Sequence, residues 1–222
     1  MIGNRGETGG IFPGGREAIK HLFAWLFSMG IFLLCERYID PSVCHSVRTP
    51  LDDLIVFSEF FVVFYVLWYF LILGSLLWLA AYSRGGFCRF LKFMTVCQII
   101  AVVIFLIWPN KQDLRPRVIG GDNIFASVVR LIHSVDTNTN VCPSLHVCYS
   151  IALVSVWMRE GRRALTKIIY VVLAVLISLS TVFIKQHSVL DIAVAIPVSF
   201  VAEMVTYPKF WKERFTKRRV KV

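Results

Sequence analysis

Long apolar runs separated by short polar stretches organise this chain from end to end. A helix needs about 20 mostly apolar residues to cross a bilayer. Six runs reach or approach that length, and they cover residues 18–36, 57–82, 88–108, 144–158, 167–184 and 188–206. The pattern predicts an all-α, polytopic membrane protein, built as a six-helix transmembrane bundle. We expect one membrane-embedded domain over 1–222, with tails at 1–17 and 207–222.

Composition strengthens the membrane prediction and changes how the charge is interpreted. The 222 residues are 57% hydrophobic and only 17% charged, with a mean hydropathy of +0.67. Soluble domains carry about 25% charged residues, so this chain needs a bilayer as its second solvent. A net charge of +10 would suggest nucleic acid in a soluble protein. Here the Lys and Arg residues lie between apolar runs, so we expect the lipid bilayer as partner and no nucleic acid.

The distribution of Lys and Arg predicts the topology. If the N-terminus is cytoplasmic, seventeen of the 24 Lys and Arg residues fall in cytoplasmic segments and seven fall outside. Cytoplasmic loops of membrane proteins carry such an excess. We therefore expect a multi-pass plasma-membrane protein with both termini in the cytoplasm and the tail 207–222 at anionic headgroups.

Three polar stretches lie on the same predicted, extracytoplasmic face. They are Lys111-Gln-Asp-Leu-Arg-Pro-Arg117 after the third run, Pro143-Ser-Leu-His146 at the start of the fourth, and Ser180-Thr-Val-Phe-Ile-Lys-Gln-His-Ser-Val-Leu-Asp191 between the fifth and sixth. Together they bring two histidines, a carboxylate, a helix start and several cations to one face. Such a set can hold an anion, attack it and protonate what leaves.

Each stretch also has a plainer interpretation when it is taken alone. His187 and Asp191 share one helix face, where a carboxylate can fix an imidazole tautomer or simply join two helices. Ser144 and His146 open a helix whose N–H groups suit an anion, although a cap and an interfacial histidine would look the same. Arg115 can bind a phosphate with two parallel hydrogen bonds or belong to a solvated basic loop.

The three stretches together resemble the signature of the type 2 phosphatidic acid phosphatase superfamily. That signature is a Lys…Arg-Pro segment, a Pro-Ser-x-His segment and a Ser-Arg-x5-His-x3-Asp segment, in this order, on a six-helix membrane core. The resemblance covers residues 108–191. The Ser-Thr-x-Phe-x-Lys-Gln-His form of the last segment looks most like the branch that includes inositol-phosphoceramide-synthase-like phosphotransferases.

The resemblance implies a role for each matching residue. His187 would be the nucleophile that forms a phosphohistidine, Asp191 would orient it, and His146 would be the general acid. Arg115 and Ser144 would bind the phosphoryl oxygens, and no metal or other cofactor would be needed. The family's first Lys and its Arg fall on Trp108 and Thr181 in this chain. Lys111 and Lys185 are candidates to replace them in binding phosphate.

The resulting hypothesis is a lipid-phosphate phosphatase that hydrolyses a phosphomonoester or diphosphate at the extracytoplasmic face. Two alternatives stay open. A lipid phosphotransferase of the inositol-phosphoceramide-synthase type would pass the phosphoryl group to an alcohol. A non-catalytic lipid-binding or transport protein on the same fold would need none of the chemistry. The sequence does not select the lipid or the oligomeric state.

Overall fold

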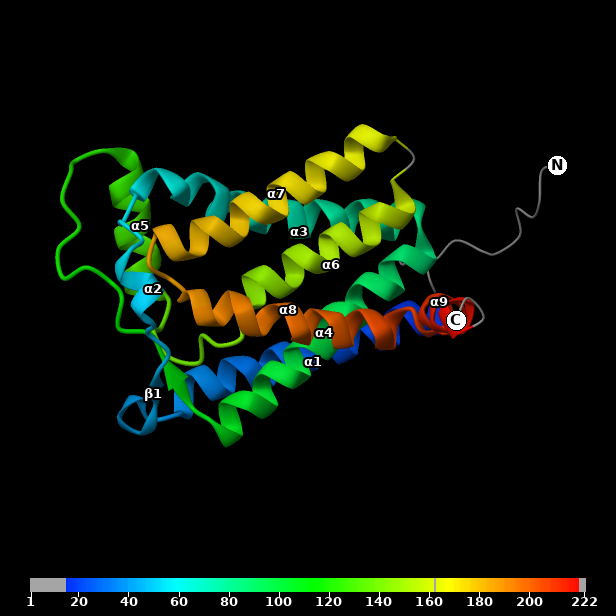
Figure 1. The fold of residues 1–222 in the computed structure, drawn as a ribbon, viewed down its shortest axis with the longest axis horizontal. Coiled ribbons are helices and arrows are strands. Elements are labelled where there is room, and N and C mark those ends of the chain that lie inside the picture. The colour runs from blue at the N-terminus through cyan, green and yellow to red at the C-terminus, as the bar shows by residue number, and fades with distance from the viewer. Residues whose placement is uncertain (1–14, 162, 220–222) are drawn as a thin grey trace.

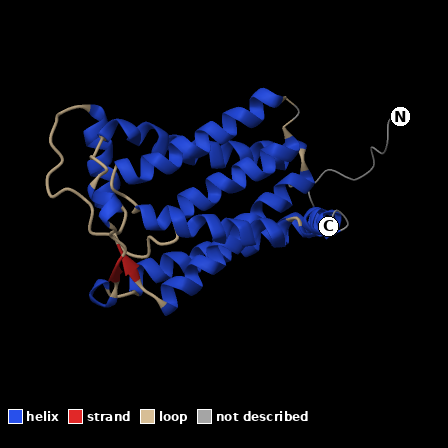
Figure 2. Ribbon diagram, in the orientation of Figure 1, coloured by secondary structure: helices blue, strands red, loops and turns tan. Residues whose placement is uncertain are grey.

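The computed structural model describes residues 15–161 and 163–219, so nearly all of the predicted tail 1–17 and residues 220–222 lie outside the described residues. The chain is almost entirely helical (Figures 1 and 2). The long helices are α1 (Gly15–Tyr38), α3 (Val62–Tyr82), α4 (Arg84–Ile107), α6 (Leu145–Glu160), α7 (Ala164–Phe183) and α8 (Val189–Thr206). The shorter elements are η1 (Pro41–Val43), β1 (His45–Ser46), α2 (Pro50–Asp53), η2 (Glu59–Phe61), β2 (Asn110–Lys111), α5 (Ile124–Val135) and α9 (Pro208–Arg219).

Five of the six predicted spans are confirmed as helices long and apolar enough to cross a membrane. The exception is the fourth, predicted over 144–158 and found as α6, which has 16 residues. At 1.5 Å per residue such a helix is about 24 Å long, short of the roughly 30 Å hydrocarbon core. The count of six spans is therefore not confirmed, although the all-α membrane architecture is.

The core of the bundle lies between α4, α6 and α8. Helix α6 packs against α3, α4, α7 and α8. Its inward residues include Tyr149 and Leu153, each 2% exposed, and Phe90 and Met94 of α4 are buried against the same cluster. By contrast α1, α3 and α7 expose large apolar side chains, for example Phe27 and Phe70. Apolar surface on this scale would aggregate in water, and a bilayer accounts for it.

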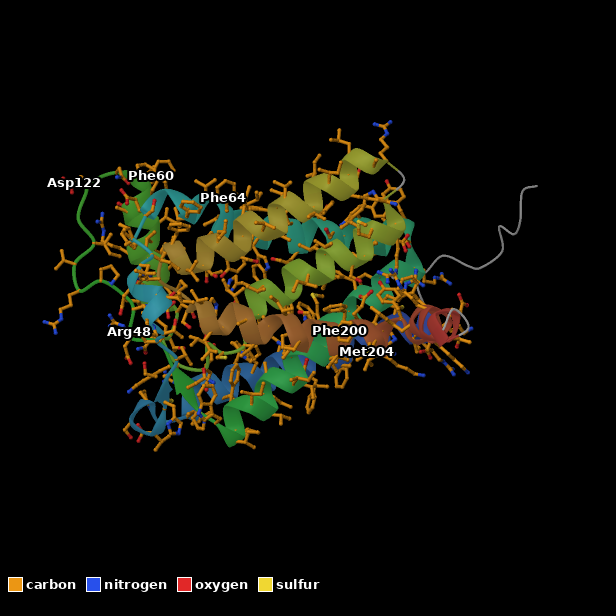
Figure 3. All side chains as sticks on the ribbon, viewed as in Figure 1. Arg48, Phe60, Phe64, Asp122, Phe200 and Met204 are labelled. Atoms are coloured by element: carbon orange, nitrogen blue, oxygen red, sulfur yellow. The ribbon has the colours of Figure 1, made fainter. Side chains whose placement is uncertain are left out.

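The two ends of the bundle differ. Helices α2 and α5 and strand β1 lie at one end, whereas α9 and the start of α1 lie at the other (Figure 1). Figure 3 shows Arg48 and Asp122 at the first end and Phe200 along the length of the bundle. At the second end, Arg159 pairs with Glu203 at 2.5 Å, and Arg89 pairs with Glu160 at 3.0 Å. Charge is therefore concentrated at the two ends, as a protein that crosses a membrane requires.

The polar segment 109–143 is more structured than its composition indicates. Within it α5 packs Val129 against Val62, Tyr65 and Ile184, and Ala126 of the same helix is also buried. Strand β2 pairs in parallel with β1, aligning His45 with Asn110, and Lys111 bridges to Thr139. The apolar pattern of the sequence does not predict these elements, because α5 is shorter than a membrane span and each strand has only two residues. These contacts fix the loop that leads into α6.

Candidate active site

The reversal between α7 and α8 places His187 at the mouth of the bundle. Lys185 has φ of 60°, the left-handed conformation that often ends a helix. The backbone N–H groups of Gln186 and His187 then both donate to the carbonyl of Thr181, at 2.9 and 3.0 Å. From α2, a carboxylate oxygen of Asp52 accepts from the backbone N–H of Val189 at 2.8 Å. His187 thus sits on a turn that is held from both sides.

His187 and Asp191 form the pair that their spacing predicts. Nδ1 of His187 lies 3.1 Å from Oδ2 of Asp191, whose side chain is fully buried. The same oxygen accepts from the backbone N–H of Ser188 at 2.9 Å, which completes a capping box at the start of α8. One carboxylate therefore both caps the helix and occupies Nδ1 of the ring. A carboxylate at Nδ1 leaves Nε2 as the nitrogen able to act on a substrate.

Asn110 positions the Pro-Ser-Leu-His segment. Its Oδ1 accepts from the backbone N–H groups of Val141 and Cys142, at 2.9 and 2.8 Å, and its Nδ2 donates to the carbonyl of Cys142 at 3.0 Å. Ser144 then caps α6, since its Oγ accepts from the N–H of Val147 at 3.4 Å. Pro143 lies just outside the helix rather than in its first turn. The segment places His146 in the first turn of α6.

His146 faces His187 from the neighbouring helix. The two ring centroids are 5.6 Å apart with the planes tilted by 62°. The ring of His146 also stacks on Tyr65 and lies against Trp68, with centroids 4.5 and 4.3 Å away. Its Nε2 is buried and has no hydrogen-bond partner among the described residues. Packing therefore holds this nitrogen in place, and no described residue uses its hydrogen-bonding capacity.

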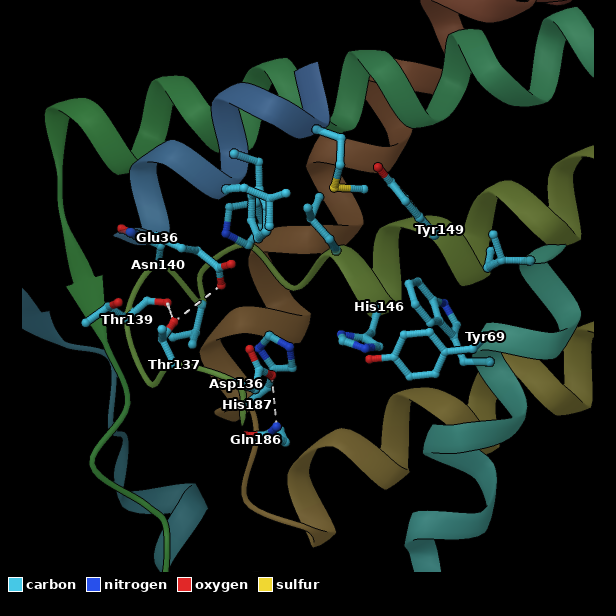
Figure 4. A pocket seen from close by; sticks show the side chains of 18 of the residues that line it. Glu36, Tyr69, Asp136, Thr137, Thr139, Asn140, His146, Tyr149, Gln186 and His187 are labelled. Carbon is cyan, nitrogen blue, oxygen red and sulfur yellow. Dashed lines mark hydrogen bonds between the residues drawn. The ribbon is translucent and has the colours of Figure 1, made fainter. Parts of the chain in front are cut away.

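Both histidines line a cavity of about 470 Å³ (Figure 4). One wall is apolar and comes from α1 and α3, including Trp25, Phe32, Trp68 and Leu73. The other end is polar and lies around His187 (Figure 4). The polar residues there are Glu36, Asp136, Thr137, Thr139, Asn140 and Gln186. A volume of this size is in the range of small-molecule sites.

Arg115 reaches the rear of this site with both Nη groups engaged, whereas its buried Nε has no hydrogen-bond partner among the described residues. Nη1 donates to the carbonyls of His133 and Asp136, both at 3.0 Å. Nη2 donates to the carbonyl of Thr137 at 2.7 Å and to Oε1 of Gln186 at 2.5 Å. Gln186 in turn donates to Asp136 at 2.9 Å. The guanidinium thus ties the end of α5 to the residue before His187, and it is not one of the cavity-lining residues.

The structure does not bring the other predicted phosphate ligands to the cavity. Nζ of Lys185 donates to the carbonyls of Asp52 and Ile55, at 2.9 and 2.6 Å. Nζ of Lys111 donates to the carbonyl of Pro41 at 3.2 Å. Ser144 is fully buried under its own helix cap. Neither Lys185 nor Lys111 is among the residues that line the cavity with the two histidines.

The residues at the two family positions also point elsewhere. Trp108 stacks on His45 with ring centroids 6.1 Å apart. Thr181 is buried in α7, where its Oγ1 donates to the carbonyl of Ser178 at 2.8 Å. Of the described residues that line the cavity, none is Lys or Arg. Within 15–161 and 163–219 there is also no group of three or more His, Cys, Asp or Glu arranged to hold a metal.

Burial moves the pKa values of two ionisable groups, Asp136 in the cavity wall and His133 of α5. Burial raises the pKa of Asp136 above its usual value, and the charges of His187 and Arg115 oppose this rise. Burial, together with the charge of Arg115, lowers the pKa of His133 to about 4. Nε2 of His133 lies 2.9 Å from the carbonyl of Ile184, which fits a neutral ring that donates from this nitrogen.

Sequence reasoning missed Glu36, Asp136 and Asn140 as parts of this cavity. Glu36 lies at the end of the first apolar run, and the other two belong to the polar run before Pro143. An acidic residue at the end of a span was the available signal for Glu36, since such residues are often functional. Nothing in the sequence indicated that α1 and the segment 136–140 meet at the histidines.

Comparisons with known proteins give one likeness, which is structural. No family model and no curated protein matches the sequence. Among solved structures, the chain is similar to the crystal structure of Aquifex aeolicus LpxE, with 15% sequence identity and a TM-score of 0.51. The match covers 81% of this chain and 94% of that chain. The fold is therefore shared with LpxE over most of the length of both proteins.

Proposed function

We propose that this protein is a membrane lipid-phosphate phosphatase of the type 2 phosphatidic acid phosphatase kind. The observation that carries the proposal is the triad-like arrangement of His187, Asp191 and His146. A buried carboxylate holds Nδ1 of His187 at 3.1 Å, and a second imidazole stands 5.6 Å away across the cavity, measured between ring centroids. The fold likeness to LpxE supports the framework on which these residues sit.

The proposed reaction has two steps. Nε2 of His187 attacks the phosphorus, the bond from phosphorus to the lipid oxygen breaks, and His146 gives a proton to the leaving alcohol. Water then bonds to the phosphorus, loses a proton to His146, and the bond between phosphorus and Nε2 breaks. Asp191 accepts the hydrogen bond from Nδ1 and stabilises the imidazolium that forms at His187, as an orienting carboxylate does in other nucleophile–base systems.

In this proposal, groups other than Lys111 and Lys185 bind the phosphate. The N-terminus of α6 carries backbone N–H groups with no partner inside the helix, and Leu145 and His146 of that turn line the cavity. A helix N-terminus favours an anion. Arg115 contributes positive charge from behind Gln186 and fixes that side chain, rather than clamping the phosphate directly.

The apolar wall of the cavity is the proposed binding surface for the lipid chain of the substrate. Helices α1 and α3 contribute aromatic and aliphatic side chains that lead from the histidines along the bundle. An acyl or prenyl chain buries apolar area there, worth about 0.8 kcal/mol per CH₂ group. We further propose that both termini are cytoplasmic and that the histidines face the extracytoplasmic side, because Lys and Arg concentrate at the α9 end.

The direct test is release of inorganic phosphate by the purified protein in detergent, without added metal. The substrates are phosphatidic acid, phosphatidylglycerophosphate and undecaprenyl diphosphate, with His187→Ala and His146→Ala beside the wild type. We expect release by the wild type and a loss of at least about a hundredfold in His187→Ala. Transfer of the phosphoryl group to an added lipid alcohol, with no release to water, would favour a phosphotransferase.

A further inference from the structure

Helix α5 lies across the end of the bundle rather than along it (Figure 1). Its Val129 packs against Val62 and Tyr65, which belong to the first turn of α3. It also packs against Ile184, which directly follows the last residue of α7. Because α3 and α7 are both long and apolar enough to span a membrane, their ends mark its boundary. Helix α5 therefore lies at the depth of that boundary, with its axis roughly in the membrane plane.

The face of α5 that points away from the bundle is apolar. Ile124, Leu131 and Val135 are 69, 62 and 78% exposed, and the half-buried Val128 lies between them along the helix. At positions i, i+4, i+7 and i+11, these four residues form one stripe, the outer stripe. A helix that packs on a protein and faces water carries polar side chains at such positions. The outer stripe therefore needs an apolar surface to cover it.

The exposed polar side chains of α5 gather on one flank of the helix. They belong to Ser127, Arg130 and Ser134. Nη1 of Arg130 donates to the carbonyl of Gly121 at 3.0 Å, in the loop that precedes α5. In Figure 3, Asp122 of the same loop lies farther from the bundle than α5 does. The polar flank of α5 therefore faces the aqueous side of the membrane boundary.

The opposite flank joins the outer stripe to the lipid-facing surface of the bundle. Phe125 contacts Phe60, with ring centroids 5.3 Å apart. Phe60 is exposed and comes two residues before α3, whose exposed Val63 and Phe70 continue the same face at helical spacing. One apolar surface therefore runs from α3 onto α5. The bilayer that covers α3 is positioned to cover the outer stripe as well.

We propose that the outer stripe of α5 lies among the headgroups and upper acyl chains of the bilayer that the bundle spans, so that α5 is an in-plane membrane anchor. A helix of this kind buries its apolar face about 5–10 Å into the boundary between headgroups and acyl chains. Helix α5 ends at Val135, directly before Asp136 of the cavity wall. The anchor therefore fixes the depth of the cavity mouth relative to the headgroups, whether or not the protein hydrolyses a lipid.

Depth-dependent quenching of a fluorescent label tests the anchor. Leu131→Cys on the outer stripe and Ser134→Cys on the polar flank are each labelled with bimane and reconstituted in phosphatidylcholine nanodiscs. The six native cysteines are buried or half-buried, and wild type treated with the same reagent gives their background. Phe70→Cys is the reference for a lipid-facing side chain of a spanning helix. The quenchers are aqueous iodide and phosphatidylcholine brominated near either the ester end or the methyl end of its acyl chains.

We expect bromine near the ester end to quench the label of Leu131→Cys at least about threefold more than that of Ser134→Cys, since only the outer stripe enters the lipid. Iodide should give the reverse order. Bromine near the methyl end should quench Phe70→Cys more than Leu131→Cys, because an in-plane helix stays shallow. Val135→Cys and Ser127→Cys repeat the comparison at other turns of α5, so that one misfolded variant does not decide it.

Two results overturn the anchor. Equal quenching of the outer-stripe and polar-flank labels by iodide, with little quenching of either by brominated lipid, would show that both flanks of α5 face water. Protection of the Leu131→Cys label from iodide and from both brominated lipids would show that a protein surface, such as a second copy of the chain, covers the outer stripe instead of the bilayer.

Discussion

Nη2 of Arg115 donates to Oε1 of Gln186 at 2.5 Å, directly beside the residue expected to attack the phosphate. The same guanidinium also holds the carbonyls of His133, Asp136 and Thr137. We therefore propose that Arg115 positions His187 through Gln186. Its planar fork serves several acceptors at once, which the ammonium of Lys cannot reproduce.

We expect Arg115→Lys to lower kcat at least about tenfold while KM changes less than about threefold, because the variant disturbs a positioned catalytic group more than it disturbs binding. The melting temperature should fall as well, since backbone carbonyls lose their donor. Arg117→Lys, at an exposed position two residues on, is the matched control. A rise in KM alone would instead indicate that Arg115 binds the phosphate itself.

Asp191→Asn tests the carboxylate that holds the imidazole. The amide keeps the size of the side chain but can present an N–H to Nδ1, which favours the wrong tautomer of His187. Activity should fall roughly a thousandfold or more, as in other enzymes with an orienting carboxylate. The capping box weakens too, at a cost of about 1 kcal/mol in the free energy of unfolding. Activity within tenfold of wild type would show that the pair is only structural.

Lys185→Met distinguishes a structural lysine from a phosphate ligand. Nζ bonds the carbonyls of Asp52 and Ile55, and each unpaired buried acceptor costs about 1–3 kcal/mol. We expect a lower melting temperature with KM unchanged. Lys111→Met, whose ammonium donates to one exposed carbonyl, should change neither. A tenfold higher KM at unchanged melting temperature would restore Lys185 to phosphate binding.

His133 should make stability depend on pH. Its pKa is lowered to about 4 in the folded protein, against about 6.5 when unfolded. The neutral ring is preferred in the fold, so its stabilising contribution is present above pH 6.5 and is lost as the pH falls toward 4. Gln keeps a donor for the carbonyl of Ile184 but does not titrate. His133→Gln should therefore flatten the fall in melting temperature between pH 6.5 and 4.5, and an unchanged slope would contradict the assignment.

The membrane helices could be predicted from the sequence because apolar length is a local property. Helix α6 is shorter than the membrane-spanning helices because it begins after Ser144 and ends before Gly161, whatever the thickness of the bilayer. Helix α5 was missed because a short helix inside a polar segment is stabilised by tertiary contacts with Val62 and Ile184.

In the candidate site, too, local features could be predicted from the sequence, whereas tertiary contacts could not. His187 and Asp191 were predictable because their spacing alone places them together at the start of a helix. The hydrogen-bond partners of Lys185, Lys111 and Arg115 could not be predicted. A long cationic side chain can reach several acceptors, and the tertiary structure determines which acceptor it contacts. Glu36 joins the site through packing of α1 against the bundle, which one sequence does not show.

The most direct test of the central claim is to trap the phosphohistidine. Wild-type protein is mixed with phosphatidic acid that carries a radiolabelled phosphate and is quenched in alkali within the first turnover. We expect label on the wild-type protein that is stable to alkali and lost in acid, with none on His187→Ala. Label that persists on His187→Ala, or lipid turnover by that variant at the wild-type rate, would contradict the assignment of His187 as the nucleophile.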